Sequence, residues 1–204
     1  MTLRRLVLLR HGETDYNAEG RWQGHLDSQL TQTGWNQARF AVPALTRFAP
    51  EVVVASDLHR ALDTATVFTE AAGLDLRVDK RLRETNLGQW QGLTSKDVDE
   101  RWPGAQATWR RDATWAPPGG ESRVDVARRA AELVAELDDE FDGTVLLGTH
   151  GGLIGGLTAQ LLELPLANWA QLGGMGNCHW TVLGRRPEDP GPWRLVTYNA
   201  GITG

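Results

Sequence analysis

The chain has 204 residues, of which 41% are hydrophobic and 23% charged, and its formal net charge is −5 at pH 7. This length predicts one domain with a sizeable core, and the acidic balance provides no basic field for nucleic acid. No apolar run is long enough for a secretory signal or a membrane span, so we expect a cytoplasmic protein with no membrane partner. The single cysteine, Cys178, excludes an internal disulfide and a metal site built from several cysteines.

The first predicted element is a strand that ends in charged residues. Leu6 to Leu9 are continuously apolar, which is typical of a strand buried on both faces of a parallel sheet. Arg10, His11 and Gly12 follow directly. Open α/β sheets bind their ligands at the carboxyl ends of the strands, so we expect Arg10 and His11 to lie at an anion-binding site.

Strands and helices then alternate. The polar loop 14–28 leads to Thr31, a residue type favoured at helix N-caps, and to apolar residues at helical spacing as far as Leu45. Three elements follow in order: a buried strand over 52–55, a helix from about 58 that ends at Gly73, and a short strand over 74–78.

The second half of the chain contains an insertion and then returns to the same pattern. The stretch 82–120 is rich in Trp, Pro and Gly, and we predict only one short helix in it, at about 95–102. The elements predicted after it are a helix over 126–137, a buried strand over 145–147, a helix over 151–162, and two antiparallel edge strands over 179–183 and 193–198, joined by a turn rich in Pro and Gly. The whole pattern predicts a three-layer α/β/α fold with a mostly parallel central sheet and an antiparallel edge.

Two further strand ends supply residues suited to an anion. The strand over 145–147 leads into His150, Gly151 and Gly152, and a helix that begins at Gly151 would offer free backbone N–H groups and the positive end of its dipole to a phosphate. Arg60 comes soon after the strand over 52–55. Its planar guanidinium can bind two phosphate oxygens at once and stays charged.

Taken together, these segments resemble the histidine phosphatase superfamily, which includes the phosphoglycerate mutases. The similarity covers essentially the whole chain. It is carried by Arg10-His11-Gly12-Glu13-Thr14, the segment around Arg60, Leu82-Arg83-Glu84 followed by Gly88-Gln89-Trp90-Gln91-Gly92, and His150-Gly151. The resemblance implies a phosphoglycerate mutase-like fold in a single domain, 1–204, with a loop-rich and helical substrate-cap insertion at about 82–122. It also implies a phosphoric monoester hydrolase that uses no metal and no other cofactor.

The resemblance implies roles for individual residues. His11 would be the nucleophile that accepts the phosphoryl group, Glu84 the general acid, and Arg10, Arg60 and His150 would surround the phosphoryl oxygens. The physics agrees, because phosphoryl transfer spreads charge over the equatorial oxygens and positioned cations stabilise that charge. Arginines should also disfavour the imidazolium form of His11, while a backbone carbonyl holds its other ring nitrogen as N–H. The residues expected to bind substrate are Asn17, Gln23, Gly24, Gly151, Arg110, Arg111 and Trp115.

Three alternatives remain at this point. His11, His150 and Glu84 could be zinc ligands, although two arginines in the same pocket would repel the metal. A cofactor-dependent phosphoglycerate mutase shares the catalytic centre, and the run Trp109-Arg110-Arg111 is similar to the mutase segment whose arginines hold a glycerate carboxylate. The residues after Glu84 are instead phosphatase-like. The third alternative is a non-catalytic regulatory protein that binds phosphate esters.

A closer resemblance, outside the catalytic centre, is to the glucosyl-3-phosphoglycerate phosphatases, through segments 112–117, 119–126 and 173–177. It implies a small-molecule phosphate ester as substrate, such as glucosyl-3-phosphoglycerate. Trp90, Trp109 and Trp115 offer flat surfaces for a sugar ring. Exposed tryptophans could also form a homodimer contact, whose position the sequence does not locate. Segment 173–177 is either a rim of the pocket or a simple turn.

Overall fold

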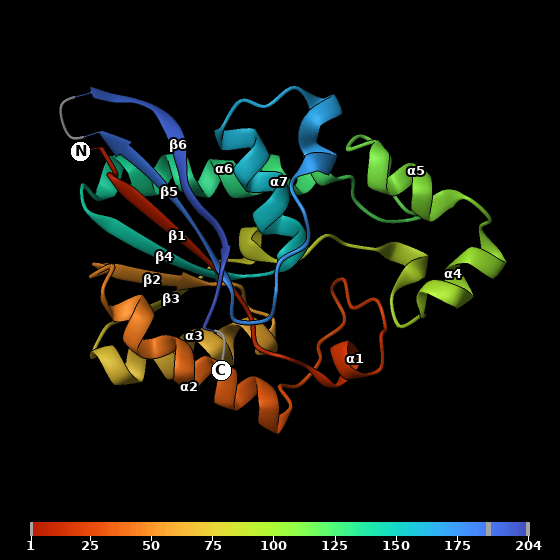
Figure 1. The fold of residues 1–204 in the computed structure, drawn as a ribbon, viewed down its shortest axis with the longest axis horizontal. Helices are drawn as coiled ribbons and strands as arrows, with labels where there is room; N and C mark the ends of the chain where they lie inside the picture. Colours follow the sequence, from red (N-terminus) through yellow and green to blue (C-terminus); the bar gives the residue numbers. More distant parts are fainter. Residues whose placement is uncertain (1, 187–188, 203–204) are drawn as a thin grey trace.

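A six-stranded sheet lies between two layers of helices in the computed structural model, which describes residues 2–186 and 189–202 (Figure 1). The strand order is β3-β2-β4-β1-β5-β6, in which β1 to β4 run parallel and β5 and β6 are antiparallel to their neighbours. The predicted three-layer fold with an antiparallel edge is therefore confirmed. The strands are β1 (Arg5–Arg10), β2 (Val52–Ala55), β3 (Leu76–Val78), β4 (Thr144–Thr149), β5 (Trp180–Arg186) and β6 (Asp189–Ala200).

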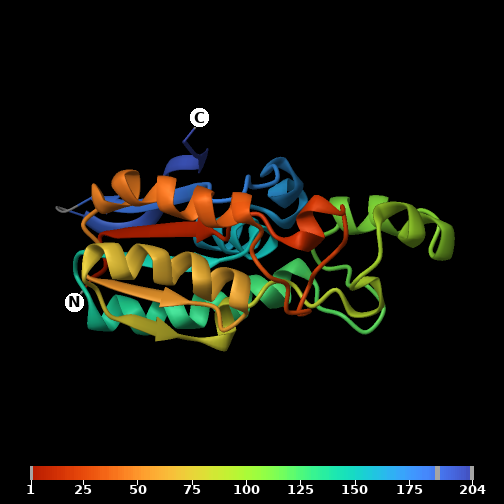
Figure 2. The ribbon, with the colours of Figure 1, turned by 90° about the horizontal axis from the view of Figure 1, so that it is seen from below.

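The helices form a framework layer on each face of the sheet and a separate group at one end. The α-helices are α1 (Asp15–Ala18), α2 (Gln32–Thr46), α3 (His59–Ala72), α4 (Ser95–Arg101), α5 (Ala105–Arg111), α6 (Arg123–Glu140) and α7 (Gly151–Leu161). Three 3-10 helices are η1 (Lys80–Leu82), η2 (Gly88–Trp90) and η3 (Leu166–Gln171). Figures 1 and 2 show α4 and α5 projecting together from the end of the molecule near α1.

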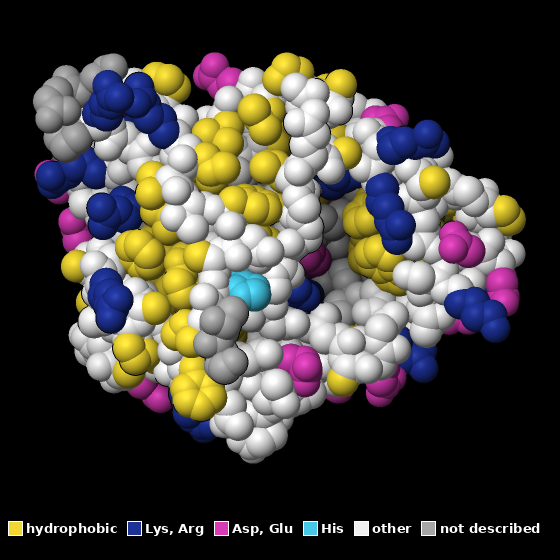
Figure 3. All heavy atoms as spheres, viewed as in Figure 1, with side chains coloured by type: hydrophobic (Ala, Val, Ile, Leu, Met, Phe, Trp, Pro, Cys, Tyr) yellow, Lys and Arg dark blue, Asp and Glu magenta, His cyan; other side chains and the backbone are white. Residues whose placement is uncertain are grey.

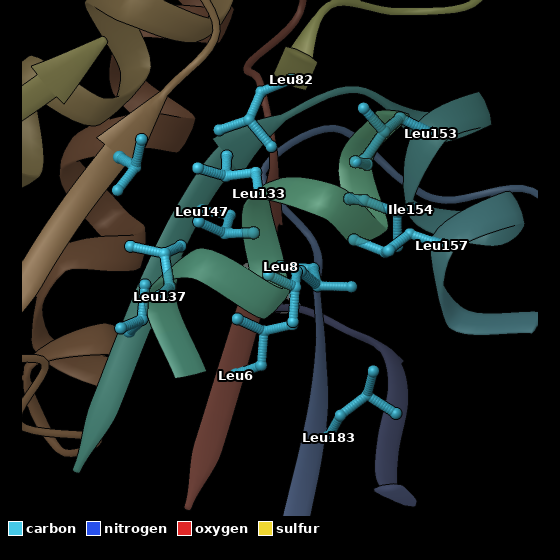
Figure 4. Packing of buried hydrophobic residues seen from close by; sticks show 14 of the residues in the cluster. Leu6, Leu8, Leu82, Leu133, Leu137, Leu147, Leu153, Ile154, Leu157 and Leu183 are labelled. Carbon is cyan, nitrogen blue, oxygen red and sulfur yellow. The ribbon is translucent and has the colours of Figure 1, made fainter. Parts of the chain in front are cut away.

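Successive side chains of a strand point to opposite faces of the sheet, so the core consists of two layers. Leu6 and Leu8 of β1 pack with α6 and α7, whereas Val7 and Leu9 pack with α2 and α3. Figure 4 shows the first layer, where leucines of β1 and β4 meet Leu153 and its neighbours on α7. Because both faces are covered, β1 is apolar at every interior position, as the sequence indicated.

Most predicted elements are confirmed, but two predictions were wrong. The insertion contains a second helix, α5, which begins after Gly104; this glycine has a φ of 78°, a left-handed conformation that separates α5 from α4. Strand β5 is not an edge strand, since it pairs with both β1 and β6. The predicted turn between β5 and β6 includes residues 187–188 and lies partly outside the described residues.

A cluster of tryptophans joins the projecting helices to the main body. Trp22, which follows α1, contacts Trp90 and Trp109, and the cluster continues through Trp102 and Trp115. All nine tryptophans of the chain are buried or half-buried, and a homodimer contact through them stays a prediction. Within the described part of the chain, no helix combines the length and the apolar character needed to cross a membrane.

Candidate active site

The carboxyl ends of three neighbouring strands bring the expected residues together. In the parallel pair β1–β4, Arg10 lies opposite Thr149, so His11 and His150 follow at the same edge of the sheet. Their ring centroids are 5.3 Å apart, with 60° between the ring planes. Strand β2, on the other side of β4, leads to Ser56 and to Arg60 in the first turn of α3. This convergence follows from the topology, because parallel strands end at one side of the sheet.

His11 is buried and held in one tautomer. Its Nδ1 lies 2.7 Å from the carbonyl oxygen of Gly12, which can only accept, so Nδ1 carries the proton and Nε2 keeps its lone pair. Burial lowers the pKa of His11 well below its ordinary value, and the charges of Arg10 and Arg60 lower it further. The expected effect of the arginines is therefore present, although burial is the larger cause. His11 is neutral at physiological pH.

The two arginines beside His11 are anchored by backbone carbonyls. Arg60 is buried, and its Nη1 and Nη2 donate to Leu26 and Gly24 at 2.8 and 2.7 Å. Burial lowers the pKa of Arg60 to about 10, which still leaves the guanidinium charged at neutral pH. Arg10 donates from Nη1 to the Met175 carbonyl. The Nε atoms of both arginines are buried without a hydrogen-bond partner among the described residues, so each retains a donor for an anion.

His150 lies edge-on to His11 and is fully buried. Its Nε2 is 2.9 Å from Oγ of Ser56, and burial, with the nearby charge of Arg60 and the His11 ring, lowers the pKa of His150 well below its ordinary value. The Nδ1 atom has no hydrogen-bond partner in the described structure. His150 is thus a second neutral imidazole in contact with the first.

Glu84 occupies the N-terminus of α7. Its two carboxylate oxygens accept the N–H groups of Gly152 and Leu153 at 3.0 and 3.1 Å, and one of them also accepts the Thr85 N–H at 2.8 Å. A Cβ at position 152 would lie 2.5 Å from Oε1 of Glu84, so glycine is needed for this approach. The sequence suggested that the N–H groups at the start of α7 would face a phosphate, but two of them hold the Glu84 carboxylate instead.

A cavity of about 570 Å³ extends from these residues to the wall formed by α5 and the start of α6. Figure 3 shows the hollow between the main body and the projecting part, with hydrophobic side chains on the wall of that part and charged side chains deeper inside. The expected residues that line it are Arg10, His11, Asn17, Gln23, Gly24, Arg60, Glu84, Arg110 and Gly151.

Two expected substrate-binding residues lie elsewhere. Arg111 is exposed and Trp115 packs against Trp90, with ring centroids 5.6 Å apart; neither is among the described residues that line the cavity. On α5, successive residues point in different directions, so Arg110 reaches the cavity whereas Arg111 turns towards solvent. Trp115 lies beyond the end of α5, and the apolar cluster buries it in part.

Sequence reasoning missed two residues at the site. Asn177 donates from Nδ2 to the His11 carbonyl at 3.2 Å and to Oδ1 of Asn17 at 3.1 Å. Because Oδ1 of Asn17 also accepts the Thr14 N–H, the amide nitrogen of Asn17 is the end left for a ligand. Arg123, the first residue of α6, also lines the cavity. Both residues lie in segments that carry the closer resemblance, 173–177 and 119–126, but the sequence indicated no role for either of them, and Arg123 precedes the helix predicted over 126–137.

Segment 173–177 forms part of the cavity rim, since Gly173, Gly174 and Met175 line the cavity. The zinc alternative finds no support in the geometry: in residues 2–186 and 189–202, no three His, Cys, Asp or Glu side chains are grouped closely enough to hold a metal ion. The polar groups that converge on His11 are guanidinium donors, which suit the oxygens of a phosphate.

A neutral imidazole with a free nitrogen, set between arginines at the carboxyl end of a parallel sheet, is suited to phosphoryl transfer from a phosphate ester. The chain belongs to the histidine phosphatase superfamily: the family model for branch 1 of this superfamily matches residues 6–201. It is 53% identical to the glucosyl-3-phosphoglycerate phosphatase of Mycobacterium tuberculosis, over 98% of this chain and 96% of that protein. It is 50% identical to the enzyme of the same name from Mycolicibacterium vanbaalenii, with the same coverage.

A solved structure shows the same similarity in three dimensions. The mycobacterial glucosyl-3-phosphoglycerate phosphatase in complex with VO3 superimposes with a TM-score of 0.91 at 54% identity, covering 97% of this chain and all of the other. The resemblance noted in the sequence is therefore confirmed at the level of the superfamily, and the chain is a phosphatase.

Proposed function

We propose that this phosphatase hydrolyses glucosyl-3-phosphoglycerate, or a closely related phosphorylated sugar acid, through a phosphohistidine at His11. The observation that carries the reaction is the tautomer of His11: Nδ1 is bound to the Gly12 carbonyl, and Nε2 is free beside Arg10 and Arg60. Phosphoryl transfer needs a placed nucleophile and fixed positive charge, and this end of the cavity provides both.

The proposed reaction has two steps. In the first, the Nε2 lone pair of His11 attacks phosphorus, the bond from phosphorus to the ester oxygen breaks, and Glu84 gives its proton to the leaving alkoxide. In the second, the Glu84 carboxylate takes a proton from water, the hydroxide attacks phosphorus, and the P–N bond breaks. His11 regains its lone pair, Glu84 regains its proton, and phosphate leaves. Arg10, Arg60 and His150 surround the phosphoryl oxygens throughout.

In this proposal the leaving group is the sugar-acid part of the substrate, and the cavity beyond His11 would hold it. Segment 82–122 would act as a cap inserted in a single domain, 1–204, because it carries η2, α4 and α5 and closes one side of the cavity. Asn17, Gln23, Gly24 and Gly151 line the cavity and would contact the phosphorylated end. The names of the two mycobacterial relatives, aligned over nearly the whole chain, support the choice of sugar acid.

A phosphate-release screen tests the substrate. We expect kcat/KM for glucosyl-3-phosphoglycerate to exceed that for 3-phosphoglycerate, fructose bisphosphates and other sugar phosphates, since specificity is a ratio of these constants. The mutase alternative is tested in the same series with 3-phosphoglycerate and a bisphosphoglycerate primer. Isomerisation in place of phosphate release would overturn the proposal, and phosphate binding without turnover of any ester would favour a regulatory binding protein.

A further inference from the structure

The cavity contains more positive charge than the phosphoryl group alone accounts for. Among the described residues that line it, the charged ones are Arg10, Arg21, Arg60, Arg110, Arg123 and one carboxylate, Glu84. Arg10 and Arg60 flank His11, and Arg21 is paired with Glu19 at 2.7 Å. Two arginines are left on the opposite wall, Arg110 at the end of α5 and Arg123 at the start of α6.

Arg123 is held in place but incompletely partnered. Its Nη2 donates to the Trp109 carbonyl, and its guanidinium carbon lies 5.2 Å from the centroid of the Trp109 ring. Its Nε is buried without a hydrogen-bond partner, and its guanidinium forms no ion pair with any residue that the structure describes. Burial lowers the pKa of Arg123 and the charge of Asp112 opposes this, but Asp112 does not come within ion-pair distance. A cation that is anchored through Nη2 and keeps a donor without a partner therefore lines the cavity.

Two features of this placement are unfavourable for stability. Ser122 caps α6, so Arg123 stands in the first turn, where the helix dipole disfavours a cation. A buried N–H without a partner is a further cost. Both costs would be relieved by an anion in the cavity. Arg110, by contrast, is exposed, and one of its nitrogens lies 3.4 Å from Oε1 of Gln106 on its own helix.

We propose that Arg123 binds the carboxylate of the substrate, and that this contact selects phosphate monoesters that carry a second anionic group. The inference rests on the proposed function and deepens it, because it assigns the acidic part of the sugar acid to a residue. The planar guanidinium suits a carboxylate, and the ring of Trp109 beneath it fixes its orientation. The two anionic ends of the ester would thus be bound at opposite walls of the cavity.

The test uses two esters that differ only in the carboxylate: glucosyl-3-phosphoglycerate and the corresponding glucosylglycerol phosphate, in which a CH2OH group replaces it. For Arg123→Gln we expect kcat/KM for the carboxylate ester to fall about 10- to 100-fold, mostly through KM, as for a lost hydrogen bond to a charged group. For the glucosylglycerol phosphate, which lacks the carboxylate, kcat/KM should fall less than about threefold. Arg123→Lys, which keeps the charge without the planar fork, should be intermediate.

Two matched variants complete the experiment. Arg111→Gln, on the exposed side of α5, should leave kcat/KM unchanged for both esters. Arg110→Gln should lower kcat/KM by similar factors for the two esters, in contrast to Arg123→Gln. The thermal unfolding midpoint of each variant monitors folding. Equal losses for both esters in Arg123→Gln, or a carboxylate-selective loss in Arg110→Gln alone, would overturn the assignment while phosphatase activity persists. Failure of the unmodified enzyme to hydrolyse either ester would instead overturn the proposed function.

Discussion

The two ends of the cavity are built in different ways. At the sheet end, each polar side chain is fixed by a partner close to a strand end: His11 by the Gly12 carbonyl, Arg60 by two loop carbonyls and His150 by Ser56. At the cap end, the wall consists of aromatic side chains that pack on one another, with Trp109 at 5.3 Å from Trp22 in an edge-on arrangement. This difference is the basis for proposing that the framework of the fold determines the reaction and that the insertion determines which ester enters.

The largest effect should come from the nucleophile at the sheet end. We expect His11→Ala to lower kcat by at least about 10⁴-fold, since loss of a nucleophile leaves only binding and electrostatic stabilisation. After incubation with substrate and an acid quench, the unmodified enzyme should carry acid-labile phosphate and the variant none. His59→Gln is the control, because His59 is also a histidine near the carboxyl end of a strand but is exposed. Acid-labile phosphate on the His11 variant would place the nucleophile elsewhere.

The next effect separates the two roles of Glu84. We expect Glu84→Gln to lower kcat about 10²- to 10⁴-fold for sugar esters, whose alkoxide needs a proton to leave. With p-nitrophenyl phosphate, whose leaving group needs no proton, the first step should survive while attack by water slows. The variant should therefore release one equivalent of nitrophenolate in a burst and accumulate acid-labile phosphate.

An equal loss for both kinds of ester, without a burst, would show that Glu84 acts only through its contacts with α7. Glu84→Asp is the matched variant. It keeps the carboxylate but draws it back from the Gly152 and Leu153 N–H groups, so a fall in stability without a burst would identify the structural contribution.

The sheet end should also make stability depend on pH. The pKa values of His11 and His150 are lowered by burial in the folded state, whereas in the unfolded chain both histidines titrate near 6.5. Below that pH the unfolded state binds more protons, so the free energy of unfolding falls as pH falls. Each histidine contributes a slope of up to about 1.4 kcal/mol per pH unit.

Urea unfolding between pH 7.5 and 5.5 measures this slope. His11→Gln and His150→Gln should each reduce it. A slope that neither buried variant alters would contradict the neutral, buried state of the two imidazoles. Substitutions in the aromatic cluster of the cap, which contains no histidine, should lower stability equally across this range.

The sequence predicted the sheet end far better than the cap end. Apolar runs such as Leu6 to Leu9 are unambiguous because the strand is buried on both faces, and parallel topology then brings His11 and His150 together. Helix α5 was missed because a Pro-Gly pair precedes it and it is short. Which side chains of the cap reach the cavity depends on tertiary packing, so Arg111 and Trp115 could not be distinguished from Arg110 and Trp109 by pattern alone.

The smallest effect should be found at the cap end and should alter specificity alone. Trp109 lines the cavity, whereas Trp102 belongs to the same aromatic cluster without lining it. We expect Trp109→Phe to raise KM for glucosyl-3-phosphoglycerate about 3- to 10-fold, because a smaller ring offers the sugar less surface. For 3-phosphoglycerate, which lacks the sugar but keeps the carboxylate assigned to Arg123, the increase in KM should be smaller. For Trp102→Phe with either ester, the change should stay below about twofold. If Trp109→Phe raised KM equally for both esters, Trp109 would support the cavity as a whole. The proposed division, in which the sheet end carries out the reaction and the cap end selects the ester, would then not hold.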